Sequence, residues 1–566
     1  MQPSTPPPAR SSAIRRFGPL IAIVVVVLIV AAVVVATRNN NDSNTATPTA
    51  TTAPGAQAGV VSFTQAKADG TENSINWGDR CDTSIGKLKY PSYFAGDCYA
   101  PFTGDNGGAT APGVTADTIK VVMYQAQPTD PVLNYITAAV KVDDTNDQTF
   151  ETIKNWTKFY ETYYEMYGRK IELVNFTATG TSTDEVTART DATTIAEDIK
   201  PFAVWGGPIL TTAFEDELAA RKVLCIDCGP ATSYDSQIKA GPYLWSLGAI
   251  AEQTQTHVAE YINKQLKDGN AVHAGDPAMQ SEKRKFGLIY LTTNAESERV
   301  EAVFEKSLAD DGITLAEKVA YKSPVDLQTD APQLIAKLKA AGVTSVIFSG
   351  DPVAPGPLTV AATGQEYFPE WILTGAALTD TTAFGRTYDQ RQWAHAFGVS
   401  QLAARVDPQT AGTLFLYKWF FGQDPPAPTA SPTRVVEPAL FYAVIQGLGP
   451  NLTAQGFQDA LFAAPPTTRA LTQPSLSYGD KGIWPKTDFM GVDDATEVWW
   501  NPDATGPDEL QRNGKGMYEY VQGGKRYLPG EWPSTPSLAF DPEGAVTFYP
   551  EPPASEQVPT YPSPAK

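Results

Sequence analysis

The stretch Phe202-Ala-Val-Trp205-Gly206-Gly207-Pro208 indicates the fold class of this chain. A short apolar run that ends in Gly-Gly-Pro is typical of a buried strand followed by a turn. Thr212 and Glu215 stand at capping-box spacing, which predicts a helix start near Thr212, and Thr293 and Glu296 repeat this spacing. A second apolar run at 222–226 and a second turn at Gly229-Pro230 complete one α/β unit. Such turns lie where open parallel sheets bind ligands, although an α/β edge without a ligand fits equally well.

The alternation of strands and helices continues on both sides of this unit. Apolar runs that end in turns are interleaved with helical periodicity in two successive series, so we predict two α/β lobes of related construction. The predicted strands are 118–124, 171–176, 286–291, 319–321, 343–349, 371–374, 497–500 and 517–521. The predicted helices include 150–167, 191–199, 413–421 and 435–448.

Composition favours a soluble acidic body. The chain has 566 residues, which allows two or three domains. Lys and Arg total 43 and Asp and Glu total 63, so the net charge is −20. This balance argues against nucleic acid or an anionic lipid surface as the main partner.

The N-terminus has the features of a membrane anchor. Residues 1–16 are rich in Pro and Ser, carry three Arg, and are predicted to be a cytoplasmic tail. Residues 17–37 are almost wholly apolar and, as a helix, would cross the roughly 30 Å of a bilayer. The alternative is a signal peptide cleaved near Val34 and Ala36. A flexible linker at 38–60 would then tether the body outside the cell membrane, which the chain would cross once.

The four cysteines fit an oxidising compartment. Cys81 and Cys98 lie in an extension at 61–115, and Cys225 and Cys228 form a Cys-x-x-Cys pair. Two structural disulfides, Cys81–Cys98 and Cys225–Cys228, are the simplest interpretation. A redox pair or a zinc site at Cys225 and Cys228 is the alternative, although the three His residues are scattered.

Motifs of the common enzyme classes are missing. The chain has no Gly-x-Ser-x-Gly elbow, no His-Glu-x-x-His, no P-loop and no Gly-x-Gly-x-x-Gly. An acid pair for glycoside hydrolysis stays open, because Asp and Glu are numerous. We therefore expect no enzyme, no catalytic residues, no metal and no cofactor.

Three stretches, 113–121, 207–211 and 229–232, resemble type 1 periplasmic solute-binding proteins, in particular the leucine/isoleucine/valine-binding receptors of ABC transporters. The resemblance implies two lobes, each a doubly wound parallel sheet, joined by a three-strand hinge, with the ligand in the cleft between them. Lobe 1 would comprise 116–247 and 376–485, and lobe 2 would comprise 248–375 and 486–533. A Pro-rich tail at 534–566 is expected to be poorly ordered.

The resemblance also implies a binding site. A ligand carboxylate would lie near Thr211, Ala231 and Thr232, and an ammonium group would have Asp351 as its nearest acid. The chain reads Asn294-Ala-Glu-Ser297 where amino-acid receptors of this family place a Tyr-Gly pair. The expected ligand-binding residues are Tyr124, Gln125, Gly207, Thr211, Ala231, Thr232, Glu296 and Asp351.

The resulting hypothesis is a membrane-anchored extracytoplasmic receptor. It would capture a small polar ligand, either amino-acid-like or another carboxylate, by hinge closure and deliver it to an ABC importer. A sensing or structural ectodomain of the same fold without transport is one alternative. An extracellular hydrolase is the other.

Overall fold

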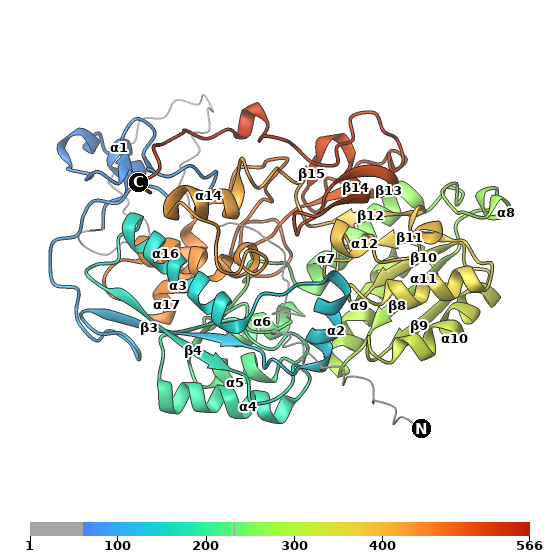
Figure 1. Ribbon diagram of the computed structural model, residues 1–566, viewed down its shortest axis with the longest axis horizontal. Helices are drawn as coiled ribbons and strands as arrows, with labels where there is room; N and C mark the ends of the chain where they lie inside the picture. Colours follow the sequence, from blue (N-terminus) through green and yellow to red (C-terminus); the bar gives the residue numbers. More distant parts are fainter. Residues whose placement is uncertain (1–59, 231–232, 566) are drawn as a thin grey trace, which may run out of the picture.

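Two parallel sheets, each covered by helices on both faces, organise the part of the chain that the computed structural model describes, residues 60–230 and 233–565 (Figure 1). Each parallel sheet has the order second, first, third, fourth and fifth strand along the chain. The two-lobed fold predicted from the sequence is confirmed.

Lobe 1 is built around β3, whose residues Val121, Val122 and Met123 are fully buried. Val121 and Met123 pack on one face with α3 and α16, and Val122 packs on the other face with α4 and α5. Burial on both faces explains why this strand is apolar without alternation. The strands, in the order β4-β3-β5-β6-β7, are β3 (Thr118–Gln125), β4 (Lys170–Thr177), β5 (Ala203–Trp205), β6 (Leu224–Ile226) and β7 (Leu244–Trp245). The helices are α2 (Pro131–Val140), α3 (Asn146–Tyr163), α4 (Glu185–Thr194) with the π-helix η2 (Ile195–Ile199), α5 (Ala213–Ala220), α6 (Tyr234–Ala240), α14 (Gly412–Phe421), α15 (Ser431–Arg434), α16 (Val436–Leu448) and α17 (Ala454–Ala463).

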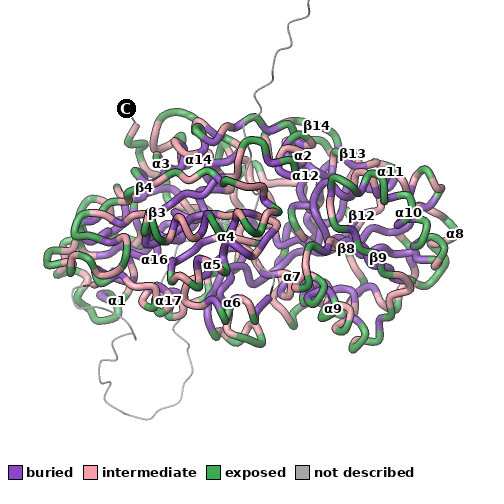
Figure 2. Tube along the Cα trace, turned by 90° about the horizontal axis from the view of Figure 1, so that it is seen from below, coloured by how far each residue is buried: buried purple, intermediate pink, exposed green. Residues whose placement is uncertain are grey.

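Lobe 2 repeats this plan and adds antiparallel strands. The parallel strands β9-β8-β10-β11-β12 are followed by β13 and β14, and β15 pairs with β13. Figure 2 shows buried backbone concentrated in the strands of both lobes. The strands are β8 (Phe286–Leu291), β9 (Glu317–Tyr321), β10 (Ser345–Ser349), β11 (Glu370–Leu373), β12 (Ala396–Ser400), β13 (Ala495–Pro507), β14 (Asn513–Tyr520) and β15 (Arg526–Tyr527). The helices are α7 (Ala251–Tyr261) with the π-helix η3 (Ile262–Leu266), α8 (Pro277–Gln280), α9 (Ala295–Asp310), α10 (Leu327–Ala340), α11 (Pro355–Gly364), α12 (Thr382–Gly385), α13 (Gln390–Trp393) and the 3-10 turn η4 (Val521–Gly523).

The chain crosses between the two sheets three times, at 246–250, 401–411 and 464–494. The first and third crossings lie side by side, because Ser246 bridges Met490 and Val492 N–H donates to Leu247 O at 3.1 Å. Arg526 joins the second and third crossings through Gln401 O and Asp494. These contacts form the hinge region between the lobes.

The lobe boundary after β11 differs from the prediction. Residues 376–400, expected in lobe 1, contain α12, α13 and β12, and β12 pairs in parallel with β11 in the second sheet. The strand is short and contains Gly398, where a side-chain Cβ would come within 2.4 Å of Leu373 O. A strand interrupted by glycine gives a weak apolar pattern, which is why the sequence did not predict it.

Both predicted capping boxes are shifted by one residue. Thr212 makes no capping hydrogen bond, whereas the Thr211 hydroxyl accepts from Ala213 N at 3.1 Å. In α9 the cap is Asn294, which accepts from Ser297 N at 2.9 Å. The helix starts are therefore where the sequence placed them, but neighbouring polar residues make the caps.

The extension at 61–115 packs on lobe 1. Its elements are α1 (Phe63–Ala68), η1 (Glu72–Ser74), β1 (Cys81–Asp82) and β2 (Lys87–Leu88). Cys81 is bonded to Cys98, and Cys225 to Cys228, so both predicted disulfides are present. The Tyr90 hydroxyl lies 2.8 Å from the Tyr164 hydroxyl in the core of lobe 1.

The Pro-rich C-terminal segment is held by hydrogen bonds to the second and third crossings and to the extension at 61–115, rather than being poorly ordered. From β14 it runs over the top of the molecule in Figure 1 to α1, and it includes the 3-10 turn η5 (Ala554–Glu556). Tyr549 N donates to Arg405 O at 2.7 Å, Glu556 accepts from Leu471 N at 2.7 Å, and the Tyr561 hydroxyl donates to Asp82 at 2.9 Å. Individual hydrogen bonds to distant elements hold it, and local composition does not reveal them.

The predicted cytoplasmic tail, the anchor at 17–37 and the linker up to residue 59 lie outside the described residues. Within 60–230 and 233–565, no helix combines the length and the apolar character that crossing a membrane requires.

Candidate functional site

A cleft of about 370 Å³ lies between the lobes. Its walls come from turns that follow β5, β6 and β7 in lobe 1 and β8, β10, β11 and β12 in lobe 2. The carboxyl ends of both parallel sheets therefore face one shared space, as open α/β sheets place their ligand sites. The lobe 1 wall includes Ile209, Leu210, Asp227, Gly229, Ser246 and Gly248, and the lobe 2 wall includes Asn294, Ser297, Glu301, Ser349, Asp351, Gly375 and Leu378.

Helix α2 bridges the two lobes and forms part of the cleft wall through Leu133, Ile136 and Thr137. At its start, Asp130 accepts from Val132 N and Leu133 N, both at 3.0 Å. The apolar face of α2 packs with Leu378 and Phe384 in the core of lobe 2. This helix was not predicted from the sequence, although Asp130-Pro131 before an apolar run is a recognisable helix start.

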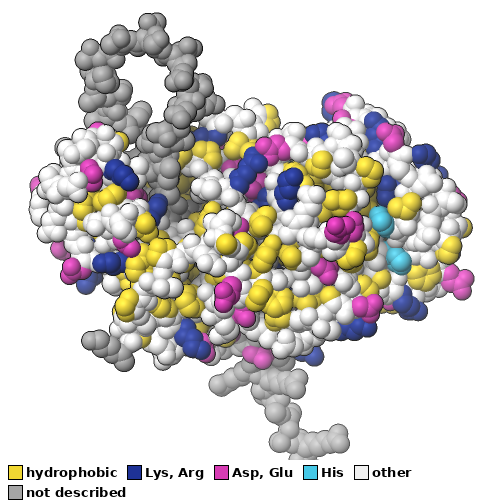
Figure 3. Space-filling view, turned by 90° about the horizontal axis from the view of Figure 1, so that it is seen from above, with side chains coloured by type: hydrophobic (Ala, Val, Ile, Leu, Met, Phe, Trp, Pro, Cys, Tyr) yellow, Lys and Arg dark blue, Asp and Glu magenta, His cyan; other side chains and the backbone are white. Residues whose placement is uncertain are grey.

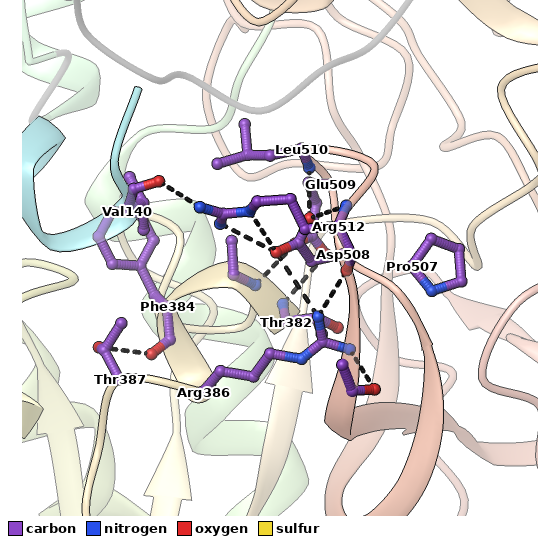
Figure 4. A network of polar contacts seen from close by, with 12 residues as sticks. Val140, Thr382, Phe384, Arg386, Thr387, Pro507, Asp508, Glu509, Leu510 and Arg512 are labelled. Atoms are coloured by element: carbon purple, nitrogen blue, oxygen red, sulfur yellow. Dashed lines mark hydrogen bonds and ion pairs between the residues drawn. The ribbon is translucent and has the colours of Figure 1, made fainter. Parts of the chain in front are cut away.

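The end of α2 is held by the β13–β14 hairpin of lobe 2 (Figure 4). Arg512 donates to Val140 O at 2.6 Å and also pairs with Asp508 at 2.9 Å. Arg386 approaches the same carboxylate at 3.5 Å. Since α2 begins on lobe 1 and ends against lobe 2, opening of the cleft requires this contact to break or α2 to move.

We expect Arg512→Leu to speed amide hydrogen exchange in α2 by roughly tenfold, because a charged hydrogen bond to Val140 O is lost. Exchange followed by mass spectrometry of α2 peptides measures this. Lys515→Leu is the matched control, since Lys515 lies on the same hairpin and pairs with the exposed Asp503. Equal exchange in α2 for wild type and Arg512→Leu would contradict the bridging role.

Asp351 is the expected site residue that lines the cleft. Its carboxylate accepts from Val353 N at 2.9 Å, Ala354 N at 3.0 Å and the Tyr321 hydroxyl at 2.5 Å. Burial raises the pKa of Asp351. These partners all belong to lobe 2, and together they contact both oxygens of the carboxylate.

Four expected residues of lobe 1 lie away from the cleft. Gln125 is fully buried and donates to Asn146 O and Asn175, and Thr211 is buried at the start of α5. Tyr124 and Gly207 line a small neighbouring cavity of about 10 Å³ beside Arg434, which shares Leu133 and Ile209 with the cleft wall. The remaining two, Ala231 and Thr232, lie outside the described residues.

Glu296 lies between the lobes but not among the cleft-lining residues. The Ser233 hydroxyl of lobe 1 donates to its Oε1, and Arg299 bonds both of its oxygens at 2.9 Å. Hydrogen bonding by Arg299 lowers the pKa of Glu296 to about 2. The residue therefore forms a charged contact between the lobes.

Two acidic residues of the cleft were not predicted from the sequence, Asp227 and Glu301. Glu301 is 6% exposed, and burial raises its pKa to about 7. Burial also raises the pKa of Asp227, which follows β6 with a left-handed backbone, φ +54°. Asp227 and Glu301 are far apart in the sequence, so only the arrangement of the two lobes shows that both line the same cleft.

Two further observations concern other kinds of site. Among residues 60–230 and 233–565, no group of three or more His, Cys, Asp or Glu is placed to hold a metal ion. On the face that Figure 3 shows, Lys and Arg side chains of the described residues are scattered among Asp and Glu.

Comparison with known proteins identifies the family of this chain. A family model described as periplasmic binding protein matches residues 144–488. The chain is similar to a solute-binding protein of an ABC transporter from R. palustris solved with 4-hydroxybenzoate, with a TM-score of 0.50, 15% identity, and coverage of 74% of this chain and 99% of that chain. It is similar to a fatty acid ABC transporter substrate-binding protein from Thermomonospora curvata, with a TM-score of 0.50, 15% identity, and coverage of 76% and 97%. No curated protein sequence matches the chain.

Proposed function

Because the chain belongs to the periplasmic binding protein family, we propose that it is an extracytoplasmic receptor that closes around a small ligand and delivers it to an ABC importer. The observation that carries the proposal is the cleft of about 370 Å³, whose walls come from both lobes. A ligand that contacts both walls stabilises the closed arrangement relative to the open one. Capture by closure requires no covalent step, so no side chain needs a catalytic role.

The hinge and α2 support closure as the mechanism. Three crossings connect the two lobes, and each sheet has its own buried core. Motion between such lobes is absorbed by a few connecting residues. Helix α2 would then close one side of the cleft when its end meets Arg512.

We also propose that residues 17–37 anchor the receptor in the cell membrane with the body outside. The support is the apolar run and the excess of Arg before it. Cell fractionation tests this: recovery of the uncleaved, full-length chain in the soluble fraction, rather than with the membranes, would contradict the anchor.

A ligand screen followed by scattering tests the receptor function. Thermal-shift assays of the full-length protein with amino acids, aromatic carboxylates, fatty acids and amines should identify a stabilising compound, because a ligand that binds only the folded state raises its stability. Small-angle X-ray scattering with that compound at saturation should show a smaller radius of gyration. An unchanged radius of gyration at saturation would contradict closure and would indicate that the protein binds its ligand without a change of shape.

A further inference from the structure

The charged groups of the cleft wall are all acidic. Asp227 comes from lobe 1, and Glu301 and Asp351 come from lobe 2, whereas the described lining residues include no Lys, Arg or His. A ligand carboxylate would be buried beside these acids without a counter-charge, which costs free energy. The wall therefore favours ligands without a negative charge.

Glu301 has acceptor capacity that the protein leaves unused. Its Oε1 accepts from Gln255 Nε2 at 3.1 Å and from the Ser349 hydroxyl at 2.9 Å. Its Oε2 has no hydrogen-bond partner among the described residues, although the side chain is 94% buried at the cleft wall. A buried carboxylate oxygen without a donor is costly unless a ligand supplies one.

Asp227, on the opposite lobe, is a second acid with an oxygen that lacks a hydrogen-bond partner among the described residues. Its Oδ1 accepts from Leu247 N at 3.3 Å and from the Ser246 hydroxyl, whereas Oδ2 has no partner among the described residues. Arg434 acts on Asp227 electrostatically but is itself paired with Glu437 at 3.2 Å. The two lobes thus present negative potential to the same space.

The rest of the wall is largely apolar. Aliphatic side chains come from α2, from the turn after β5 and from lobe 2, so the body of the ligand would contact hydrocarbon. These side chains are Leu133, Ile136, Ile209, Leu210, Leu291 and Leu378.

We infer that the cleft selects a ligand with a protonated amine on an apolar body, and that Glu301 receives the ammonium group. The inference rests on the proposed receptor function and names the chemical class of its ligand. An ammonium can donate up to three hydrogen bonds, and two acceptors of the described residues lack a partner: Glu301 Oε2 and Oε1 of Gln255, whose amide donates to Glu301. Asp227 stabilises the same charge across the cleft at longer range.

The inference predicts a specific pH dependence. Glu301 has a pKa of about 7, raised by burial, and it faces Lys318 of β9 and Tyr290 of β8, with Glu298 and Glu305 on its own helix. Lys318 is paired with Glu305. An ammonium prefers ionised Glu301, so affinity should rise as pH increases through about 7 and level off above it. Since simple amines stay protonated in this range, the change reports the carboxylate.

Three probes of similar shape test the charge preference on the full-length protein. Isothermal calorimetry would compare 2-phenylethylammonium, 2-phenylethanol and 3-phenylpropionate at about pH 8. We expect the ammonium to bind at least roughly tenfold more tightly than the alcohol, and the carboxylate to bind most weakly. Between about pH 6 and pH 8 the ammonium affinity should rise by close to tenfold, whereas that of the alcohol should not.

Glu301→Gln should remove both the preference for the ammonium and its pH dependence. Asp310→Asn is the matched control, because Asp310 lies on the same helix in an exposed pair with Lys306. Equal binding of ammonium and alcohol by wild type, tighter binding of the carboxylate, or binding of no probe would overturn the inference. If a neutral or anionic compound binds and the scattering shows closure, the receptor function stands and only the ligand class is wrong.

Discussion

Arg526→Met is expected to lower the free energy of unfolding by about 3–5 kcal/mol, because it leaves a buried carboxylate without its partner. Arg526 and Asp494 are 2.8 Å apart, and both side chains are 1% exposed. The same guanidinium donates to Leu402 O at 2.8 Å and Gln401 O at 2.9 Å in the second crossing, and to Asp494 O at 2.8 Å in the third. The substitution therefore removes a charge partner and also leaves the backbone acceptors of two hinge crossings without their donor.

Urea denaturation measures this loss, and two variants show its cause. Arg526→Met with Asp494→Leu should recover much of the stability, since the pair is then replaced by apolar groups. Arg391→Met should cost less than about 1 kcal/mol, because Arg391 is exposed and pairs with Asp389 at the surface. A loss for Arg526→Met no greater than that of Arg391→Met would contradict the role assigned to the buried pair.

Removing the Cys81–Cys98 disulfide by replacing both cysteines with alanine should cost about 3 kcal/mol, the value expected for a closed loop of this length. The two cysteines are 17 residues apart and pack with Phe63 and Trp77 in a small separate core. Such a core buries little apolar surface, so the extension depends on its covalent link. Protease digestion should then cut within 61–115 before it cuts the lobes.

Urea denaturation of the alanine variant gives the magnitude, and Ser84→Ala is the control. Ser84 lies in the same loop and hydrogen-bonds Asp82, but it is not part of the disulfide. We expect its loss to be below about 1 kcal/mol. An alanine pair as stable as wild type would show that packing alone holds the extension.

Local patterns predicted the two βα series well. The strand predicted at 118–124 is observed as β3, Thr118–Gln125, and the helix predicted at 435–448 is observed as α16, Val436–Leu448. These elements carry long apolar or periodic runs, in which the positions of the apolar residues indicate which side chains are buried. The same patterns gave helix starts near Thr212 and Thr293, within one residue of the observed caps.

The site was harder to predict, because side-chain direction depends on distant partners. Gln125 is the last residue of β3, where the sequence predicts a ligand site. Its side chain instead points into lobe 1 and donates to Asn146 O and Asn175 Oδ1. The Thr211 hydroxyl accepts a hydrogen bond from Ala213 N and so caps α5. Asp351 does line the cleft, but Tyr321, 30 residues away, occupies its carboxylate.

The sequence by itself therefore determined that the chain has two α/β lobes and which cysteines pair. Only the tertiary structure decided which side chains face the cleft. Asp227 and Glu301 belong to different lobes, and α2 joins the wall through its apolar packing on lobe 2 and the contact of Val140 with Arg512. The physical reason is that strands and helices follow from local periodicity, whereas a cleft between lobes follows from contacts between residues far apart in the chain.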